Sequence, residues 1–263
     1  MKIIRPYSVI LNPPTLQDSL GKIEWCGRIS HRSEEAQTAD SWKRFIETVV
    51  VSHGDWSIVE HVSVTVDTVV DRGITHEWVR HRLFSFTQES TRFVNYEKKM
   101  PPSFIYPKPD IECEHCLNGS SPERRSLSKD VKNYSWTVQW GHQVENGEYI
   151  DGYHKYYTLC AYDKNWLDCI AQAEEGYKVL LSQGWRPQEA RSVFPNALAS
   201  RIITTGNLRN WRHFLIMRTT LEAHPQIRQV CIPLLEEFKK IFPVLFDDII
   251  SLQKQSEAMR KPR

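Results

Sequence analysis

The sequence lacks a marked excess of charge of either sign. Its 263 residues carry 34 lysines and arginines against 32 aspartates and glutamates, which gives a formal net charge of +2. Proteins that bind nucleic acid or anionic membranes by general attraction usually have a larger positive excess, so we expect neither partner. Clusters of positive charge in this chain must therefore act locally.

The sequence also lacks long apolar runs and the cysteine pattern of a disulfide framework. No stretch reaches the roughly 18 consecutive apolar residues of a membrane-spanning helix, and Pro6 interrupts the apolar start, which is too short for a secretory signal. Six cysteines are scattered along the chain, at positions 26, 113, 116, 160, 169 and 231. This pattern is typical of reduced thiols and not of a disulfide framework, so we expect a cytoplasmic protein.

One short motif raises the question of a metal. Cys113, His115 and Cys116 lie in "CEHC", a spacing that occurs in zinc sites. A structural zinc site needs a full tetrahedral set of ligands, usually completed by a second such pair. The sequence offers no second pair, so we expect no metal site.

Apolar periodicity predicts mostly helices with a few strands, and hence an α+β fold class. The length suits a single domain, residues 1–263, and we expect an insertion at about 107–135 inside a proline-rich stretch that begins near residue 100. The elements that we expect are helices over 39–51, 74–84, 149–183, from 187, 208–218 and from 225, strands over 62–70 and 201–205, and an ordered loop after residue 84. Asn207 is expected to cap the helix over 208–218.

The segment "RHRLFSFTQESTRF", residues 80–93, gathers basic side chains beside hydroxyl groups. Arg80 and Arg82 would point in different directions on a helix, whereas Ser90 and Arg92 would share one side of an extended loop. A hydroxyl, an arginine and loop amides together suit a phosphate. The alternative is a solvated basic turn that forms weak surface ion pairs with Glu89.

Five segments in order resemble the flavin-dependent thymidylate synthase family. Arg80, His81 and Arg82 followed by seven residues and Ser90 resemble the family's hallmark motif, and the resemblance extends over about residues 20 to 245. The other matching segments are "GRIS" at 27–30, "SIVEHVSVTV" at 57–66, "EARSVFPNAL" at 189–198 and "NLRNWRHFLIMR" at 207–218. Glu77 stands where some members have glutamine, and His213 stands where asparagine is also found.

The resemblance implies a fold in which a small mixed or antiparallel sheet packs with several helices. It also implies the reductive methylation of dUMP to dTMP, with methylenetetrahydrofolate as carbon donor, FAD as hydride carrier and NADPH as reductant. The family's flavin site lies between subunits, so a homotetramer with shared active sites is implied. The second hypothesis is a non-catalytic nucleotide- or RNA-binding protein that uses the basic loop, and it predicts a colourless protein with salt-dependent affinity.

The resemblance also implies which residues bind each ligand. The implied dUMP-binding residues are Glu77, Arg80, Gln88, Glu89, Ser90, Thr91, Arg92, Arg191 and Arg218. The implied FAD-binding residues are Ser30, Ser57, Glu60, Arg80, His81, Arg82, Gln88, Asn207, Arg209 and His213. Arg218 is the catalytic candidate, because a guanidinium can stabilise negative charge on a pyrimidine but cannot act as a base. Ser90 is not expected to be a nucleophile, since no neighbouring base is evident.

Overall fold

The computed structural model describes residues 2–98, 101–107, 136–139, 143–145, 148–150, 154–157 and 161–249, and side chains only within 2–98, 101–107 and 165–249. The chain divides into two compact units, each described here by itself. Unit 1 comprises Met1–Tyr7, Val69–His76 and Gln88–Ile202, and unit 2 comprises Ser8–Thr68, Glu77–Thr87 and Ile203–Arg263.

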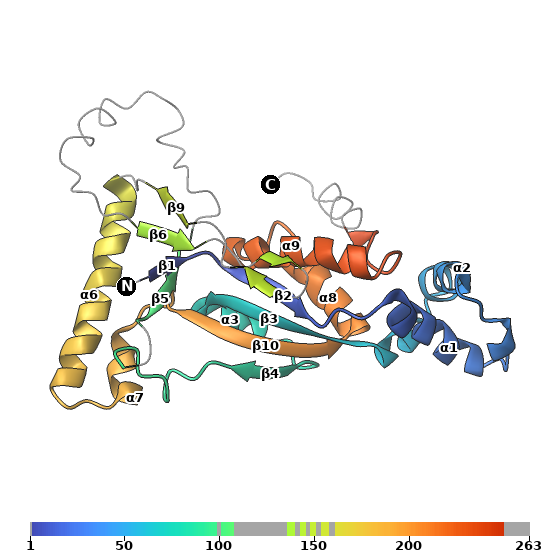
Figure 1. Cartoon of the computed structure of the whole chain (residues 1–263), viewed down its shortest axis with the longest axis horizontal. Coiled ribbons are helices and arrows are strands. Elements are labelled where there is room, and N and C mark those ends of the chain that lie inside the picture. The colour runs from blue at the N-terminus through green and yellow to red at the C-terminus, as the bar shows by residue number, and fades with distance from the viewer. Residues whose placement is uncertain are drawn as a thin grey trace, which may run out of the picture. The chain divides into compact units, whose positions relative to one another are not determined.

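Helices and small sheets are both present, so the α+β class is confirmed (Figure 1). The strands are β1 (Lys2–Ile4), β2 (Tyr7–Leu11), β3 (Ser63–Asp71), β4 (Ser85–Gln88), β5 (Ser103–Ile105), β6 (Trp136–Gln139), β7 (Gln143–Glu145), β8 (Glu148–Ile150), β9 (His154–Tyr157) and β10 (Ala199–Asn207). The α-helices are α1 (Lys22–Ile29), α2 (Ser41–Phe45), α3 (Arg72–Trp78), α6 (Ala161–Ser182), α7 (Pro187–Ala190), α8 (Leu208–Arg218) and α9 (Pro225–Ile241). Shorter π or 3-10 segments are η1 (Gln17–Gly21), η2 (Glu34–Ala36), η3 (Ile46–Ser52), η4 (Trp56–His61) and η5 (Arg191–Val193).

Unit 1 contains a mixed four-stranded sheet in the order β5-β1-β6-β9. Strand β1 pairs in parallel with both β5 and β6, whereas β6 and β9 are antiparallel. The long helix α6 supplies Ile170 and Tyr177 to a core that also contains Phe104 and Leu198. Helix α7 lies beside α6 (Figure 1), and η5 also packs against α6. The Tyr177 ring stacks on Phe194 with centroids 4.6 Å apart. This core therefore places η5 and the residues after it.

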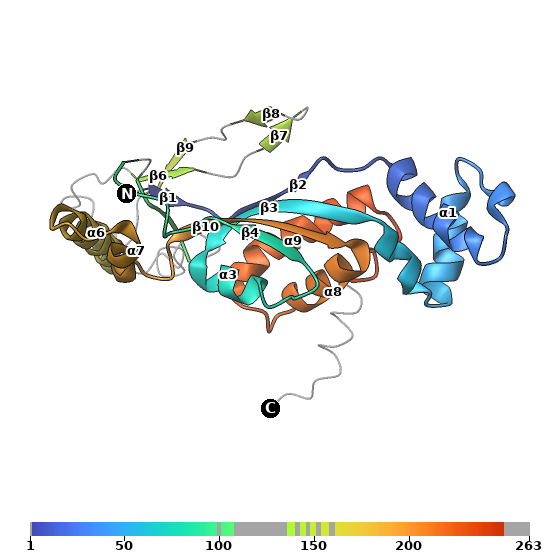
Figure 2. The same ribbon diagram turned by 90° about the horizontal axis from the view of Figure 1, so that it is seen from below.

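In unit 2, helices α8 and α9 pack together beside the strands (Figure 2). The second four-stranded sheet has the order β2-β3-β10-β4, and its strands β3 and β10 contribute residues to both units. The indole N–H of Trp211 on α8 donates to the carbonyl oxygen of Val64 on β3 at 3.0 Å. Trp211 also packs on Phe238 of α9, with ring centroids 5.4 Å apart. The buried tryptophan thus joins both helices to strand β3.

An arginine connects α8 to two other segments of unit 2. The Arg212 guanidinium lies 4.3 Å from the centroid of the Trp56 ring on η4. Its Nη1 and Nη2 groups donate to the two carboxylate oxygens of Asp248, at 2.7 and 2.6 Å. A bidentate pair combined with a cation–π contact restrains both partners. Helix α8 is therefore tied to η4, whose Glu60 contributes to the site described below.

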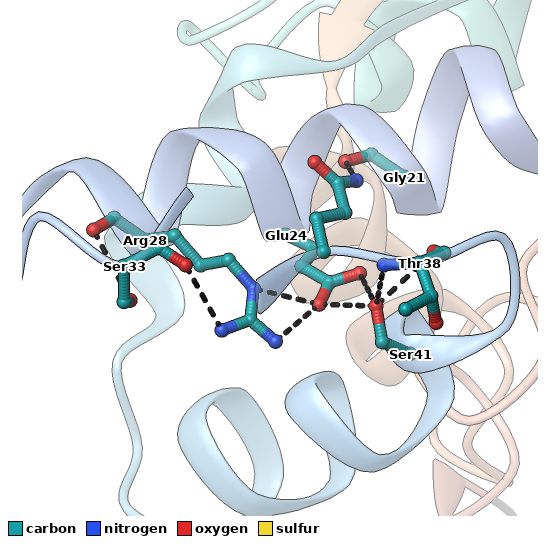
Figure 3. A network of polar contacts seen from close by, with 7 residues as sticks. Gly21, Glu24, Arg28, Ser33, Thr38 and Ser41 are labelled. Atoms are coloured by element: carbon teal, nitrogen blue, oxygen red, sulfur yellow. Dashed lines mark hydrogen bonds and ion pairs between the residues drawn. The ribbon is translucent and has the colours of Figure 1, made fainter. Parts of the chain in front are cut away.

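The first helices of unit 2 surround a buried carboxylate (Figure 3). Glu24 on α1 is fully buried, and it accepts hydrogen bonds from Arg28 on the same helix and from Ser41 at the start of α2. Gln37, in the connection between the two helices, donates to the carbonyl oxygen of Gly21 at 2.8 Å. These bonds join α1, the connection and α2 into one structural element.

Several predicted elements are confirmed. Helix α8 covers the predicted 208–218, and the Asn207 side chain accepts from the backbone N–H of Asn210 at 2.9 Å, as a cap should. Helix α9 begins at Pro225, as predicted. The predicted strand over 201–205 lies within β10, and the helix predicted over 39–51 is found as α2 continued by the π segment η3.

Three predicted elements are wrong in part. Helix α3 ends at Trp78, so the basic residues after it lie in a turn and not on the expected helix over 74–84. The expected loop after residue 84 begins with strand β4, whose Phe86 and Gln88 are half-buried while Ser85 and Thr87 are exposed. Strands β8 and β9 occupy part of 149–157, where tyrosines favour strand, and α6 begins only at Ala161.

Within the described residues, no helix is both long and apolar enough to cross a membrane.

Candidate active site

Unit 2 contains a cavity of about 850 Å³ with several basic side chains in its wall. Its walls come from η4, from the turn after α3 and from α8. This unit 2 cavity is lined by Glu60, Arg80, His81, Arg82, Leu83, Phe84, Asn207, Arg209, Asn210, His213, Met217 and Arg218. Helix α8 contributes positions 210, 213 and 217, and this spacing places them on one face of the helix.

The basic turn, Arg80–Arg82, is anchored at its start by a buried tryptophan. Trp78 is fully buried, and its indole N–H donates to Thr204 Oγ1 at 3.0 Å. The backbone N–H of His81 then donates to the carbonyl oxygen of Trp78 at 3.2 Å, which closes the turn. The hydrogen bond between Trp78 and Thr204 of β10 holds the end of α3 in place, and the basic turn that follows reaches the cavity.

Phe84 anchors the other end of the same turn. Its ring packs edge-on against Trp211 with centroids 4.7 Å apart, and Asn210 Nδ2 donates to the carbonyl oxygen of Leu83 at 3.0 Å. Gly206 is required here, because a Cβ atom at that position would lie 2.3 Å from Phe84 Cδ1. Both ends of the basic turn are therefore fixed by the core of unit 2.

Arg218, the last residue of α8, makes two side-chain contacts in the cavity wall. Its Nε–H donates to His81 Nε2 at 2.9 Å, and its Nη1 donates to Glu77 Oε2 at 3.1 Å. The Arg218 side chain is 18% exposed and that of Glu77 is 36% exposed, so solvent partly screens the ion pair. Within the described residues, the other N–H groups of Arg218 have no protein acceptor and remain available to a ligand.

His81 is neutral at pH 7. Burial of the imidazole, with smaller electrostatic contributions from Arg218 and His213, lowers the pKa of His81 to about 4. The permanent positive charge of the basic turn therefore resides on Arg80 and Arg82. Neither of these arginines has an ion-pair partner among the residues that the structure describes.

The lowered pKa of His81 predicts a pH dependence of stability. The unfolded imidazole takes up a proton near pH 6.5, whereas the folded one remains neutral down to about pH 4. The contribution of His81 to the free energy of unfolding is therefore complete above pH 6.5 and is lost as the pH falls towards 4. Arg218 and His213 face the ring, and Glu77 reaches it only through Arg218. The urea-unfolding midpoint should fall further between about pH 7 and about pH 4.5 in the wild type than in His81→Gln; equal falls would contradict the assignment.

Arg209 and Glu60 form a second ion pair at the cavity. Arg209 Nη1 lies 2.6 Å from Glu60 Oε1, and the side chains are 54% and 43% exposed. An exposed pair of this kind contributes little to stability. Because the pair is solvated, an anionic ligand could compete for Arg209 without displacing a buried partner.

Unit 1 contains a smaller pocket of about 270 Å³, again with two arginines. This unit 1 pocket is lined by Arg72, Thr91, Arg191, Ser192, Phe194, Pro195, Asn196 and Leu198. Arg191 Nη1 donates to Thr91 Oγ1 at 2.6 Å, and Thr91 is only 3% exposed. The backbone N–H of Arg72 donates to the carbonyl oxygens of Asn196 and Leu198, at 2.9 and 3.0 Å. Two guanidinium groups and two hydroxyls suit a small anion such as a phosphate.

The loop that carries Thr91 is held by its own side chains. Gln88 Nε2 donates to Thr75 Oγ1 at 2.9 Å and to Ser200 Oγ at 3.0 Å. The carboxylate of Glu89 accepts from the Tyr96 hydroxyl at 3.1 Å, and the backbone of Glu89 bonds to that of Arg201 at 2.8 Å. The Glu89 carboxylate therefore has partners within the protein, and among the described residues no ion pair joins it to Arg92, contrary to the solvated-turn alternative.

The structure brings most of the predicted residues together in two places. Those that line the unit 2 cavity are Glu60, Arg80, His81, Arg82, Asn207, Arg209, His213 and Arg218, with Glu77 bonded to Arg218. Thr91 and Arg191 line the unit 1 pocket. Ser30 and Ser57 line neither, and the Ser30 hydroxyl donates to the carbonyl oxygen of Gly27 at 2.8 Å. Ser90 and Arg92 flank Thr91 in sequence without lining the pocket.

Arg72 is a basic residue of the unit 1 pocket that was not among the sequence-based candidates. It follows strand β3 directly and begins α3, and Asp71 Oδ1 accepts from the backbone N–H of Ile74 at 3.0 Å in the manner of a helix cap. An aspartate at the end of an alternating strand, followed by an arginine, is the signal that could have identified a strand-to-helix corner with a basic residue.

The described side chains offer neither a metal centre nor an activated cysteine. Among the described side chains, no group of three or more His, Cys, Asp or Glu residues could bind a metal ion. Cys113 and Cys116, the pair of "CEHC", lie outside the described residues. Cys231 is fully buried, and burial raises the pKa of its thiol, so it is poorly suited to act as a nucleophile.

Comparison with known proteins gives one consistent family. Residues 15–244 match the family described as thymidylate synthase complementing protein. A flavin-dependent thymidylate synthase of Corynebacterium efficiens is 33% identical over 201 residues, which are 76% of this chain and 66% of the relative. One from Mycobacteroides abscessus is 30% identical over 232 residues, 86% of this chain and 78% of that relative. One from Mycobacterium tuberculosis is 27% identical over 219 residues, 81% and 73% of the two chains.

The match covers the basic turn, α8 and the Thr91 loop, and hence the residues of both the cavity and the pocket. The chain belongs to the thymidylate synthase complementing protein family, whose curated relatives are flavin-dependent thymidylate synthases.

Proposed function

We propose that this enzyme carries out the reductive methylation of dUMP to dTMP, with methylenetetrahydrofolate as carbon donor, FAD as hydride carrier and NADPH as reductant. The observation that carries the proposal is the unit 2 cavity, in which Arg80, Arg82, Arg209 and Arg218 surround one space. Neither the balanced charge of the chain nor its family supports the alternative of a non-catalytic nucleotide- or RNA-binding protein.

The residues of the unit 2 cavity fit a flavin dinucleotide. Arg80, Arg82 and Arg209 would bind its phosphates, since no buried carboxylate in the described part of the chain competes for them. Asn207 and His213 offer polar groups near the N-terminus and middle of α8, and the buried ring of Phe84 provides an apolar wall. When bound, FAD supplies the hydride transfer that the reaction requires, and nearby positive charge favours its anionic reduced form.

Arg218 has the role of an electrostatic catalyst in this proposal. A guanidinium stays protonated at every pH at which the protein folds, so Arg218 cannot remove a proton. Its free N–H groups can instead stabilise negative charge that develops on the pyrimidine of dUMP. Glu77 and Arg80 are the neighbouring candidates for contact with the nucleotide.

The phosphate of dUMP is assigned to residues of unit 1. Arg191 and Thr91 line the pocket there, and we add Arg72 to the sequence-based candidates Ser90 and Arg92. Gln88 and Glu89 would act by shaping the loop, because their side chains already bond to the protein.

We also propose the larger organisation that the family resemblance implies. Units 1 and 2 would be parts of one flavin-dependent thymidylate synthase domain of residues 1–263 with an insertion at about 107–135, since the family match includes residues of both units. Four copies would form a homotetramer whose active sites combine residues of several chains. The scattered cysteines suit a cytoplasmic enzyme.

A visible spectrum tests the proposed function most directly. The purified protein should show flavin absorption, and anaerobic NADPH should bleach it at a rate that depends on added dUMP. Turnover with methylenetetrahydrofolate should yield dTMP. A colourless protein that cannot be reconstituted with FAD, or flavin that forms no dTMP with all substrates present, would overturn the proposal.

Removing either arginine of the unit 1 pocket should weaken dUMP binding. Each charge-assisted hydrogen bond lost corresponds to roughly 1.5–3 kcal/mol, so Arg191→Ala and Arg72→Ala should each raise the dissociation constant of dUMP by about 10- to 100-fold. Isothermal titration of the FAD-bound enzyme measures this. Arg44→Ala removes an exposed arginine of α2 and serves as the control. Dissociation constants equal to that of the control would exclude the pocket as the phosphate site.

A further inference from the structure

The contact between Arg218 and His81 has a defined direction. A guanidinium has N–H donors and no acceptor. The 2.9 Å bond between Arg218 Nε and His81 Nε2 therefore requires an unprotonated Nε2 that accepts the hydrogen. A neutral imidazole with a bare Nε2 carries its proton on Nδ1. The geometry thus specifies both the charge and the tautomer of His81.

The position of the His81 ring is set by aromatic neighbours. Its edge meets the fully buried Phe214 ring with centroids 4.7 Å apart and an interplanar angle of 73°. Phe84 lies on another side, with a centroid distance of 6.5 Å and the same angle. Phe214 belongs to α8, the helix that ends at Arg218. The imidazole is therefore packed against the helix whose last side chain it contacts, which favours one orientation of Nε2.

Glu77 provides the second contact of the same guanidinium. It lies on the last turn of α3, one residue before the buried Trp78, and its Oε2 accepts from Arg218 Nη1 at 3.1 Å. His81 and Glu77 thus bind two different nitrogens of Arg218. Two anchors on a planar group fix its plane as well as its place, and they leave the remaining N–H groups for a ligand.

We propose that His81 is a positioning residue that, as a neutral Nε2 acceptor and together with Glu77, orients Arg218 for the pyrimidine of dUMP. The inference rests on the proposed function and deepens it. In this proposal the role of His81 differs from the flavin contact that the family resemblance implies, and Glu77 acts on the substrate through Arg218. The lowered pKa of His81 agrees with a neutral acceptor.

The alternative is that His81 acts as a cation for a flavin phosphate. An imidazolium carries N–H on both nitrogens, so Nε2 could no longer accept from Arg218, and two positive charges would face each other at 2.9 Å. Arg80 and Arg82, on either side in sequence, have no such conflict. The structure therefore favours different roles within the basic turn: Arg80 and Arg82 attract anions, and His81 orients Arg218.

A pair of substitutions distinguishes the roles of the two ring nitrogens of His81. In His81→Gln, the amide oxygen can reach the place of Nε2 and accept from Arg218, whereas His81→Asn offers polar atoms only near the place of Nδ1. With FAD-saturated enzyme, we expect the dissociation constant of dUMP to be about 10-fold higher in His81→Asn than in His81→Gln, one charge-assisted bond being worth roughly 1.5 kcal/mol. FAD affinity should change equally in both. Equal dUMP affinities, or a loss of FAD that follows the same order, would overturn the proposal.

A spectroscopic measurement keeps this inference separate from the proposed function. In enzyme labelled with ¹⁵N-histidine and loaded with FAD, His81 should show a protonated Nδ1 and a bare Nε2 at neutral pH, identified by the loss of its signals in His81→Gln. An imidazolium or an Nε2–H tautomer would refute the positioning role even if dTMP is formed. Conversely, the Nδ1–H tautomer in an enzyme that makes no dTMP would reject the proposed reaction and retain the Arg218–His81 contact.

Discussion

Arg218→Gln should lower kcat for dTMP formation by about two to three orders of magnitude, the usual effect of removing a group that stabilises developing charge. Glutamine keeps one NH₂ group that can donate to His81 or Glu77 but loses the positive charge and the fork of the guanidinium. The change lies at the end of α8, where the side chain is 18% exposed, so folding should be little affected. Single-turnover formation of dTMP with pre-reduced, FAD-saturated enzyme measures the chemical step.

Arg218→Lys serves as the matched comparison. Lysine keeps the charge but, as a point donor, cannot bond to His81 Nε2 and Glu77 Oε2 in the same planar arrangement. We expect an intermediate loss in kcat, with FAD content at the wild-type level in both variants. A kcat of Arg218→Gln within about 3-fold of the wild type would remove Arg218 from the catalytic step.

Elements with strong local signals could be predicted from the sequence. Asn207 before an amphipathic run identifies the start of α8, and Pro225 identifies the start of α9. The predicted end of the helix near residue 183 agrees with α6, which is followed by Gly184 at a φ of +89°. The α8 side chains that line the unit 2 cavity lie on one helix, so their grouping follows once the first residue of that helix is known.

The wrong predictions concern elements that depend on contacts between residues far apart in the sequence. Helix α3 ends at Trp78 because the indole reaches Thr204, which is 126 positions away. Strand β4 is an edge strand whose "SFTQ" alternates over only four residues, too short for the pattern to be recognised. The bond from Arg218 to His81 spans 137 positions, so no local pattern could have shown that the histidine of the basic turn is an acceptor.

Glu24→Ala should lower the free energy of unfolding by about 3–5 kcal/mol, the range found when one partner of a buried ion pair is removed. The Glu24 carboxylate is fully buried, and it binds Arg28 through Nε at 2.8 Å and Nη2 at 2.6 Å (Figure 3). Arg28 is 15% exposed and would be left without this partner. Urea unfolding of the FAD-saturated protein, followed by tryptophan fluorescence, gives the change.

The size of this loss follows from how many groups share the carboxylate. The Ser41 hydroxyl lies 2.7 and 2.8 Å from the two oxygens of Glu24, and it also accepts from the backbone N–H of Thr38 at 2.8 Å. Removing the carboxylate therefore takes the charged acceptor from both Arg28 and Ser41, on two different helices. Arg28 then retains only the carbonyl oxygen of Ser33 at 3.4 Å, and Ser41 retains that of Thr38 at 3.1 Å. In a double-mutant cycle, Arg28→Ala should cost less in the Glu24→Ala background than alone, since the interaction is then already lost.

Two further substitutions decide whether the carboxylate itself is responsible. Glu24→Gln retains an oxygen that can accept from Arg28 or Ser41, so its loss should be smaller, about 1–3 kcal/mol. Glu47→Ala removes an exposed carboxylate from η3 in the same helical region and should change stability by less than about 0.5 kcal/mol. If Glu24→Ala unfolds at the same urea concentration as Glu47→Ala, the buried network does not hold α1 and α2 together, and hydrophobic contacts such as that of Phe45 with Gly27 must do so instead.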